Sequence, residues 1–220
     1  MDSKYIHNGN LNWPQVLKIC DPPHPLFVRE HSPNCRPFLD PRYIILHWTA
    51  GGPGHTSVDW CKNPESNVSY HFVICRNGDV VQMVSLDNVA WHAGKSEWKG
   101  QKDLNKNSIG IGLANWGPLR QDGTTGLFHP YNPKYKGSII PPKSVYQERP
   151  EIEDSVYVYF ERYTTPQFYS LGLIIHALCQ SLPIVDVLGH SDVAPTRKID
   201  PGPALDMELL KRFAMIARRL

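Results

Sequence analysis

Two apolar segments that each lead into a histidine place the strongest constraint on the fold of this chain. Residues 43–47 read Tyr-Ile-Ile-Leu-His, and a second apolar run over residues 184–188 is followed by Gly189 and His190. Short apolar runs rich in β-branched residues are typical of buried strands. Histidines at the ends of two buried strands project in the same direction from a rigid sheet. The sequence therefore predicts a sheet that brings His47 and His190 together.

A cation and a carboxylate follow the second histidine on one loop. Asp200 lies ten residues after His190, Lys198 precedes it by two, and the Pro-Gly-Pro sequence after Asp200 restricts the backbone. Taken alone, His190 and Asp200 are equally well explained by a simple hydrogen bond. With His47 added, two imidazoles and one carboxylate form the ligand set of a catalytic zinc ion with an open fourth position. Such an ion polarises a carbonyl group and lowers the pKa of water from about 16 toward roughly 7.

Composition narrows the class of partner. The net charge of +2 and the pI of about 8.2 are too mild to indicate nucleic acid, although they suit an anionic wall polymer. No segment approaches the roughly 18 apolar residues of a membrane span, and the first residues lack the apolar core of a secretory signal. We expect a monomer that is made in the cytoplasm and does not insert into membranes. The five cysteines show no C-x-x-C spacing, so we expect free thiols, with a bridge between Cys20 and Cys35 left open.

Strand and helix patterns alternate along the chain, which predicts an α/β fold with a mixed central sheet flanked by helices. The expected strands cover residues 42–48, 68–75, 80–84, 108–115 and 184–188. Ser57 is the expected cap of a short helix, and longer helices are expected from residues 165 and 206, the last burying Phe213. We expect residues 1–40 to form a Pro-rich extension packed on the domain and residues 41–220 to form the catalytic domain. Within that domain, residues 118–164 read as a long irregular insert, a candidate functional flap.

Five sequence blocks occur in an order that resembles a known family, the type 2 N-acetylmuramoyl-L-alanine amidases. That family also includes phage lysis amidases and animal peptidoglycan recognition proteins. The resemblance covers roughly residues 42–117 and 165–217, and leaves the extension and the insert unmatched. The blocks are IILHWTA (residues 44–50), SYHFVI (69–74), AWHAG (90–94), NSIGI (107–111) and GHSD (189–192) with the later K-x-D-P-G (198–202).

The resemblance implies hydrolysis of the amide that joins the lactyl group of N-acetylmuramic acid to L-alanine in peptidoglycan or muropeptides. It implies one zinc ion per chain, held by His47, His190 and Asp200, and a catalytic Lys198 that stabilises the tetrahedral intermediate. Tyr70 matches a tyrosine of the phage and recognition-protein branches, whose hydroxyl orients water or bonds the oxyanion. Strand alternation then turns His71 to the opposite face, as a structural residue. The substrate-binding candidates are Thr49, Trp91 and His92.

One position departs from the cytosolic recycling branch of that family. There a glutamate follows the Ile-Gly-Ile strand and acts as general base, whereas this chain has Gly112. Proton handling therefore falls to Tyr70, Lys198 or the zinc-bound hydroxide itself. Retention of all three metal ligands argues against an inactive enzyme.

Several biological settings stay open. We favour bacterial cell lysis of the endolysin type, in which the protein reaches the wall after release through a permeabilised membrane. An antibacterial amidase injected by a secretion machine is the second hypothesis, and recycling of wall fragments is disfavoured by Gly112. A peptidoglycan-binding module without catalysis would keep the groove and lose a zinc ligand, usually the one at Asp200. Nothing in residues 1–40 supports or excludes a role in binding another protein.

Overall fold

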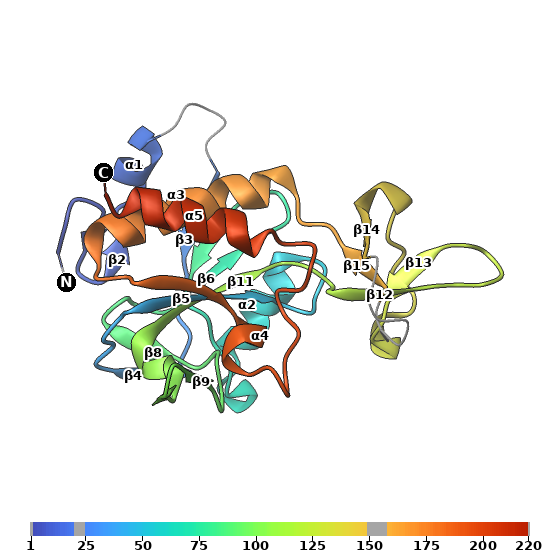
Figure 1. Cartoon of the computed structure of the whole chain (residues 1–220), viewed down its shortest axis with the longest axis horizontal. Coiled ribbons are helices and arrows are strands. Elements are labelled where there is room, and N and C mark those ends of the chain that lie inside the picture. The colour runs from blue at the N-terminus through green and yellow to red at the C-terminus, as the bar shows by residue number, and fades with distance from the viewer. Residues whose placement is uncertain (1, 20–24, 149–157, 220) are drawn as a thin grey trace.

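A six-stranded mixed sheet forms the centre of the computed structural model, which describes residues 2–19, 25–148 and 158–219 (Figure 1). All neighbouring strands are parallel except the β6–β7 hairpin, which confirms the predicted mixed α/β class. In spatial order the strands are β16 (Asp186–Gly189), β5 (Tyr43–Trp48), β11 (Ser108–Leu113), β6 (Phe72–Ile74), β7 (Val80–Gln82) and β3 (Phe27–Arg29).

The two central strands are buried on both faces, which explains why their sequences are continuous apolar runs. Ile44 and Leu46 of β5 belong to the main core beneath helices α3 (Thr165–Ser181) and α5 (Met207–Ala217), which lie across one face of the sheet (Figure 1). Ile45 packs in a separate cluster. Because strand side chains alternate between faces, His47 shares the face of Ile45 and points away from α3 and α5.

Local sequence signals account for where the helices begin. Thr164 and Gln167 form a reciprocal capping box at the start of α3, and the side chain of Asp206 caps α5. Helix α2 (Gly54–Lys62) begins after Pro53, so Ser57 lies inside the helix and its predicted capping role is wrong. The predicted burial of Phe213 is also wrong, since 37% of it is exposed at the flank of α5.

The first 40 residues contribute short elements to the domain surface and one strand to its sheet. They contain β1 (Ile6–His7), β2 (Asn10–Leu11), α1 (Trp13–Val16), the 3-10 turn η1 (Leu17–Ile19), β3 and β4 (Cys35–Pro37). β3 pairs with β7 as the sheet edge, and β4 pairs with β8 (Asn88–Ala90). These elements are only two to four residues long, which is why the sequence shows little periodicity there.

The segment expected to be an irregular insert has a sheet of its own, so that expectation is corrected. Its antiparallel strands are β13 (Phe128–Pro130), β12 (Pro118–Gln121), β15 (Tyr159–Glu161) and β14 (Val145–Gln147), in that order. Leu119, Phe128 and Ile140 form a small separate core, and the sheet projects from one end of the main sheet (Figure 1). The strands are too short to give a strong alternating pattern. The turns η4 (Pro133–Tyr135) and η5 (Pro142–Ser144) complete the described part of the insert.

The remaining elements are two to four residues long. They are η2 (Pro64–Ser66), β9 (Glu97–Trp98), β10 (Gln101–Lys102), η3 (Leu104–Asn107) and α4 (His190–Val193). Within the described ranges, no helix combines the length and apolarity that a membrane crossing requires. Cys35, Cys61, Cys75 and Cys179 are free thiols, and Cys20 lies outside the described residues.

Candidate active site

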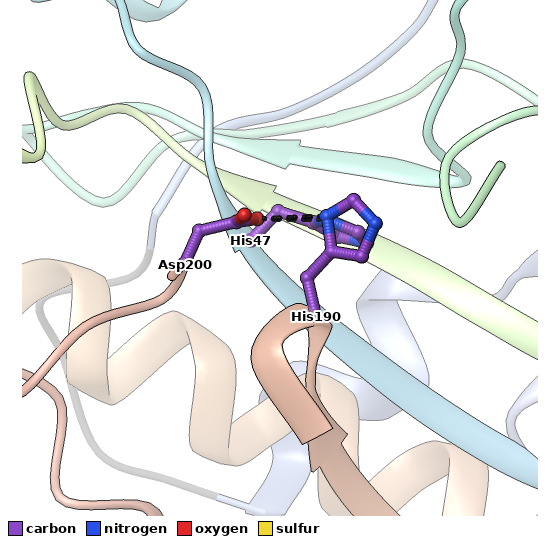
Figure 2. Close-up of side chains that lie close together, drawn as sticks. All are labelled: His47, His190 and Asp200. Carbon is purple, nitrogen blue, oxygen red and sulfur yellow. Dashed lines mark hydrogen bonds and ion pairs between the residues drawn. The ribbon is translucent and has the colours of Figure 1, made fainter. Parts of the chain in front are cut away.

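The topology brings the two predicted histidines to one edge of the sheet. β5 and β16 are adjacent and parallel, with Gly189 opposite Leu46, so His47 and His190 both follow directly from paired positions. Asp200 returns to the same point on the loop after α4. The three side chains point toward one another (Figure 2). His47 Nδ1 lies 3.0 Å from His190 Nδ1, and each of these atoms lies 3.1 Å from Asp200 Oδ2.

This arrangement fits a zinc ion. Zinc bonds of about 2.0–2.1 Å to nitrogen and oxygen in a tetrahedron place the ligand atoms about 3.3 Å apart, close to the separations here. All three residues are buried, with 1% of His47, 3% of His190 and 6% of Asp200 exposed. Two neutral imidazoles and one carboxylate leave a fourth position for a reactant, as in catalytic rather than structural zinc sites.

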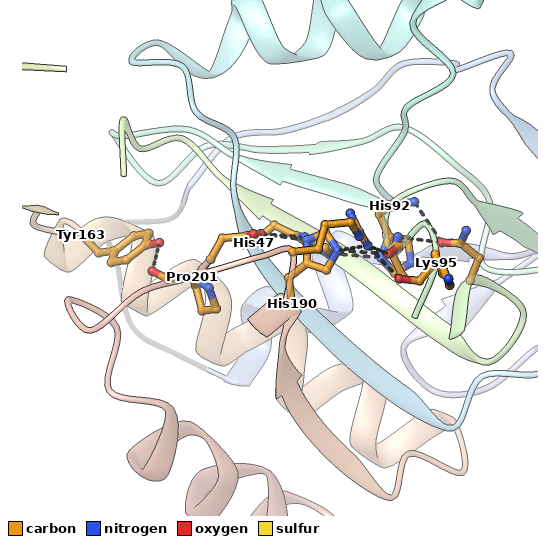
Figure 3. Close-up of polar contacts among 10 residues, drawn as sticks. His47, His92, Lys95, Tyr163, His190 and Pro201 are labelled. Atoms are coloured by element: carbon orange, nitrogen blue, oxygen red, sulfur yellow. Dashed lines mark hydrogen bonds and ion pairs between the residues drawn. The ribbon is translucent and has the colours of Figure 1, made fainter. Parts of the chain in front are cut away.

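The outer nitrogens of both imidazoles have acceptors, which fixes the tautomers that a metal requires (Figure 3). His190 Nε2 lies 3.1 Å from the Ala93 carbonyl oxygen, so it carries the proton and leaves Nδ1 as the ligand atom. His47 Nε2 lies 3.1 Å from His92 Nδ1, and His92 Nε2 lies 3.4 Å from the Ser108 carbonyl oxygen. A single direction of donation, from His47 to His92 to Ser108, satisfies this chain. Such outer partners orient metal ligands and raise their basicity.

Electrostatics favour the protonation states that metal binding needs. Burial alone would raise the pKa of Asp200, but the close approach of its carboxylate to the His190 and His47 rings outweighs burial and holds the pKa well below the ordinary range. Burial lowers the pKa of His47 to about 4, so this imidazole is neutral near pH 7. The site therefore presents an ionised carboxylate and a neutral imidazole donor without reorganisation.

Two residues that the sequence did not single out hold the outer partner of His190. The side-chain oxygen of Asn105 accepts hydrogen bonds from the backbone N–H groups of His92 (3.0 Å) and Ala93 (2.8 Å). The Arg197 guanidinium donates to the carbonyl oxygens of Ala93 (2.7 Å) and Lys95 (2.9 Å). Arg197 stands beside Lys198 in the sequence, but only the fold shows that it reaches a backbone segment a hundred residues away.

A pocket of about 680 Å³ reaches two of the three candidate ligands, His190 and Asp200, and is also lined by Trp48, next to His47 in the chain. Lys198 lines it beside Asp200, as a residue acting on a bound carbonyl would. The predicted substrate residues Thr49, Trp91 and His92 line it too. His92 is only 7% exposed and bonds His47, so most of its surface is committed to supporting that ring.

Tyr70 and His71 lie directly before β6, and their rings contact different histidines of the site. The Tyr70 ring lies 5.2 Å from the His47 ring between centroids, and His71 lies 5.9 Å from His92. His71 is held on both sides: Nδ1 accepts from the Gly110 N–H at 3.0 Å, and Nε2 donates to the Asn88 carbonyl at 2.9 Å. This bonding matches the structural position expected for it.

Tyr70 occupies the space above Gly112. A Cβ added to Gly112 would lie 3.0 Å from the Tyr70 ring and 3.2 Å from Thr49. A side chain at residue 112 would therefore require the Tyr70 ring to shift by a few tenths of an ångström. Burial raises the pKa of Tyr70 well above its ordinary value, so its hydroxyl stays protonated.

Most of the chain matches a family model. The model of the N-acetylmuramoyl-L-alanine amidase family aligns with residues 37–203, a span that contains the three candidate ligands and the pocket. The chain belongs to this family. The enzyme class expected from the sequence is thereby confirmed.

Individual relatives agree. The 1,6-anhydro-N-acetylmuramyl-L-alanine amidase AmpD of Escherichia coli (strain K12) is 28% identical over 193 residues, which cover 79% of this chain and 82% of AmpD. A crystal structure of AmpD aligns over 94% of this chain and 98% of that one, with a TM-score of 0.59 and 23% identity. The E. coli amidase AmiD, in complex with anhydro-N-acetylmuramic acid-L-Ala-D-gamma-Glu-L-Lys, aligns with a TM-score of 0.57 and 24% identity over 80% of this chain and 58% of that chain. The two structures confirm the fold.

Proposed function

We propose that this chain is a zinc-dependent amidase that hydrolyses the bond between N-acetylmuramic acid and L-alanine. The observation that carries the proposal is the convergence of His47 Nδ1, His190 Nδ1 and Asp200 Oδ2 within 3.1 Å of one another beneath an open pocket. When bound, zinc would supply a Lewis acid that polarises the scissile carbonyl and activates water. His47, His190 and Asp200 would hold it.

Other residues that line the pocket would stabilise charge and position the substrate. The Lys198 ammonium lines the pocket next to Asp200, where it would stabilise negative charge that develops on the carbonyl oxygen. The buried Tyr70 stays a neutral donor, so its role would be to orient water or bond the same oxyanion, and not to accept a proton as a base. Thr49 and Trp91 would position the muramoyl and alanyl groups on either side of the scissile bond.

On the side of the imidazoles that faces away from the candidate zinc position, His92 and Ala93 would keep the two rings aligned. Each accepts a hydrogen bond from the ligand nitrogen that faces away from the zinc site. A ring held in one tautomer and one orientation costs little reorganisation when the metal binds. The main role of His92 would be to orient His47. The small exposed part of the His92 ring would contact the substrate in the pocket.

For the biological setting we propose attack on intact wall, as in bacterial lysis, with an injected antibacterial enzyme as the variant of the same activity. Support for this setting is that residue 112 is a glycine, where the recycling branch of the family resemblance has a glutamate. The AmpD relatives favour a second candidate, hydrolysis of soluble anhydro-muropeptides in the cytoplasm, because their names specify the anhydro substrate. In both settings residues 1–40 would be an extension on a catalytic domain of residues 41–220, acting as a monomer.

The test is to incubate the purified protein with insoluble sacculi and with soluble anhydro-muropeptides, before and after exhaustive chelation and zinc restoration. Zinc-dependent release of stem peptides from sacculi supports the lytic setting. Zinc-dependent cleavage of soluble fragments alone supports the second candidate. Full activity after chelation would refute the zinc assignment, and binding without cleavage of either substrate would refute the enzyme.

A further inference from the structure

The insert reaches the catalytic pocket through one turn. Asn132, Lys134 and Tyr135 line the same pocket of about 680 Å³ as His190 and Asp200. Lys134 and Tyr135 lie in the turn η4, and Asn132 caps it. The Asn132 side chain accepts a hydrogen bond from the Lys134 backbone N–H at 3.0 Å, which stabilises the turn. One wall of the pocket therefore belongs to the insert, which contains none of the sequence blocks that carry the family resemblance.

Aromatic packing joins this wall to the domain. The Tyr135 ring packs on Trp116 with centroids 4.8 Å apart. Trp116 in turn lies so close to Gly52 that an added Cβ would be 2.5 Å from the indole. Only glycine allows this approach, so the loop after β5, the indole and Tyr135 form one continuous surface.

Buried polar contacts fix the base of the insert to the same region. Glu161 is 5% exposed, accepts from the Trp116 N–H at 2.7 Å and pairs with Arg76 at 3.2 Å. The Tyr163 hydroxyl, just after β15, donates to the carbonyl oxygen of Pro201 at 2.9 Å, next to the ligand Asp200 (Figure 3). The insert is thus tied to the loop that carries the third candidate ligand, which makes it a preorganised wall.

The positive charge of Lys134 on this wall of the pocket has no carboxylate partner among the described residues. Among the described residues lining the pocket, Asp200 is the only carboxylate, whereas Lys134, Arg197 and Lys198 are cations. Arg197 is occupied by two backbone carbonyls, and Lys198 has a role at the scissile bond. Lys134 is exposed, lies 5.6 Å above the Tyr135 ring, and pairs with no carboxylate in the described ranges.

We propose that Lys134, supported by Tyr135, is a subsite for a free carboxylate of the stem peptide. The inference rests on the proposed function and extends it to substrate selection. A stem peptide with γ-linked glutamate keeps the α-carboxylate of that residue free and also has a C-terminal carboxylate, so it offers an anion beyond the scissile amide. A cation at the pocket rim can form an ion pair with such an anion, and salt weakens that ion pair.

The test measures binding of a product peptide, which requires no hydrolysis. Calorimetry would compare L-Ala-γ-D-Glu-L-Lys with two neutralised versions, one with the glutamate α-carboxylate amidated and one with the C-terminus amidated. We expect the wild-type protein to lose about fivefold in affinity for one of the two. The amidated peptide that binds more weakly identifies the carboxylate that Lys134 contacts. The difference in affinity between that peptide and the unmodified one should become smaller at high salt.

Lys134→Met should abolish this preference, while Lys136→Met keeps it. Lys136 is the matched control, since it is equally exposed, two residues away and not among the pocket-lining residues. Equal affinities of the wild-type protein for all three peptides, no detectable binding of any of them, or an unchanged preference in Lys134→Met would overturn the subsite. A separate hydrolysis assay decides the proposed function, so wild-type cleavage with no effect of Lys134→Met would refute the subsite alone.

Discussion

Substitution of Gly110 by alanine should weaken zinc binding without touching a zinc ligand. A Cβ at Gly110 would lie 2.3 Å from Cγ and 2.7 Å from Nδ1 of His92. Carbon atoms in contact prefer separations of about 3.5–4.0 Å, so the His92 ring has to retreat by about 1 Å. The bond from His47 Nε2 to His92 Nδ1 is already 3.1 Å long, and that displacement breaks it.

Loss of such an outer partner costs about 10- to 100-fold in metal affinity, or roughly 1.4–2.8 kcal/mol. Competition with a chromogenic chelator would measure the zinc dissociation constant, and thermal unfolding of the zinc-free protein would confirm that the variant folds. Gly112→Ala is the matched control on the same strand, because its Cβ would meet Tyr70 and Thr49 instead of His92. We expect its zinc affinity to stay near that of the wild type.

His92 itself provides a second check on the same bond. His92→Leu should reproduce the loss of zinc affinity, whereas His92→Asn keeps an acceptor at the position of Nδ1 and should recover most of it. If folded Gly110→Ala and His92→Leu both bind zinc as tightly as the wild type, the argument that His92 orients His47 is wrong.

Three further results are expected. His47→Ala and Asp200→Ala should each lose both zinc and activity, because two protein ligands make an inadequate site; metal analysis of the pure variants checks this, and a fully active variant would contradict it. Lys198→Ala should keep its zinc but lose roughly 100-fold or more in kcat, as expected for one preorganised oxyanion donor, and a normal turnover number would exclude that role. Arg76→Met should destabilise the protein by about 3 kcal/mol in denaturant unfolding, because it leaves the buried Glu161 without its partner; an unchanged midpoint would show that the pair does not anchor the insert.

The convergence of His47, His190 and Asp200 could be predicted from the sequence, because it follows from strand geometry and from one short restrained loop. Two buried parallel strands that end in histidines place both side chains at one edge, and a short restrained loop can return a carboxylate to that edge. The role of Lys198 was implied by the family resemblance, and its place two residues before Asp200 brings it to the same pocket. Each strand pattern and the spacing from His190 to Asp200 are local, so the sequence shows them directly.

The supporting contacts depend on tertiary packing and could not be predicted in this way. The hydrogen bond between His47 and His92 exists because Gly110 has no side chain, and nothing in the sequence near His92 shows which residue lies beneath its ring. The roles of Arg197 and Asn105 likewise involve backbone atoms distant in sequence. The sequence of the insert predicts irregular chain because strands of three or four residues have too few positions to show alternation.

The most direct test of the account is to identify the bond that the zinc-loaded protein cuts. Muropeptides or sacculi would be digested and the products analysed by mass spectrometry after labelling of newly formed amino termini. The account predicts peptides that begin with a labelled L-alanine, together with muramic acid that carries a free lactyl carboxylate, and no such products after zinc removal. Cleavage at any other bond, or identical products from the zinc-free protein, would contradict it.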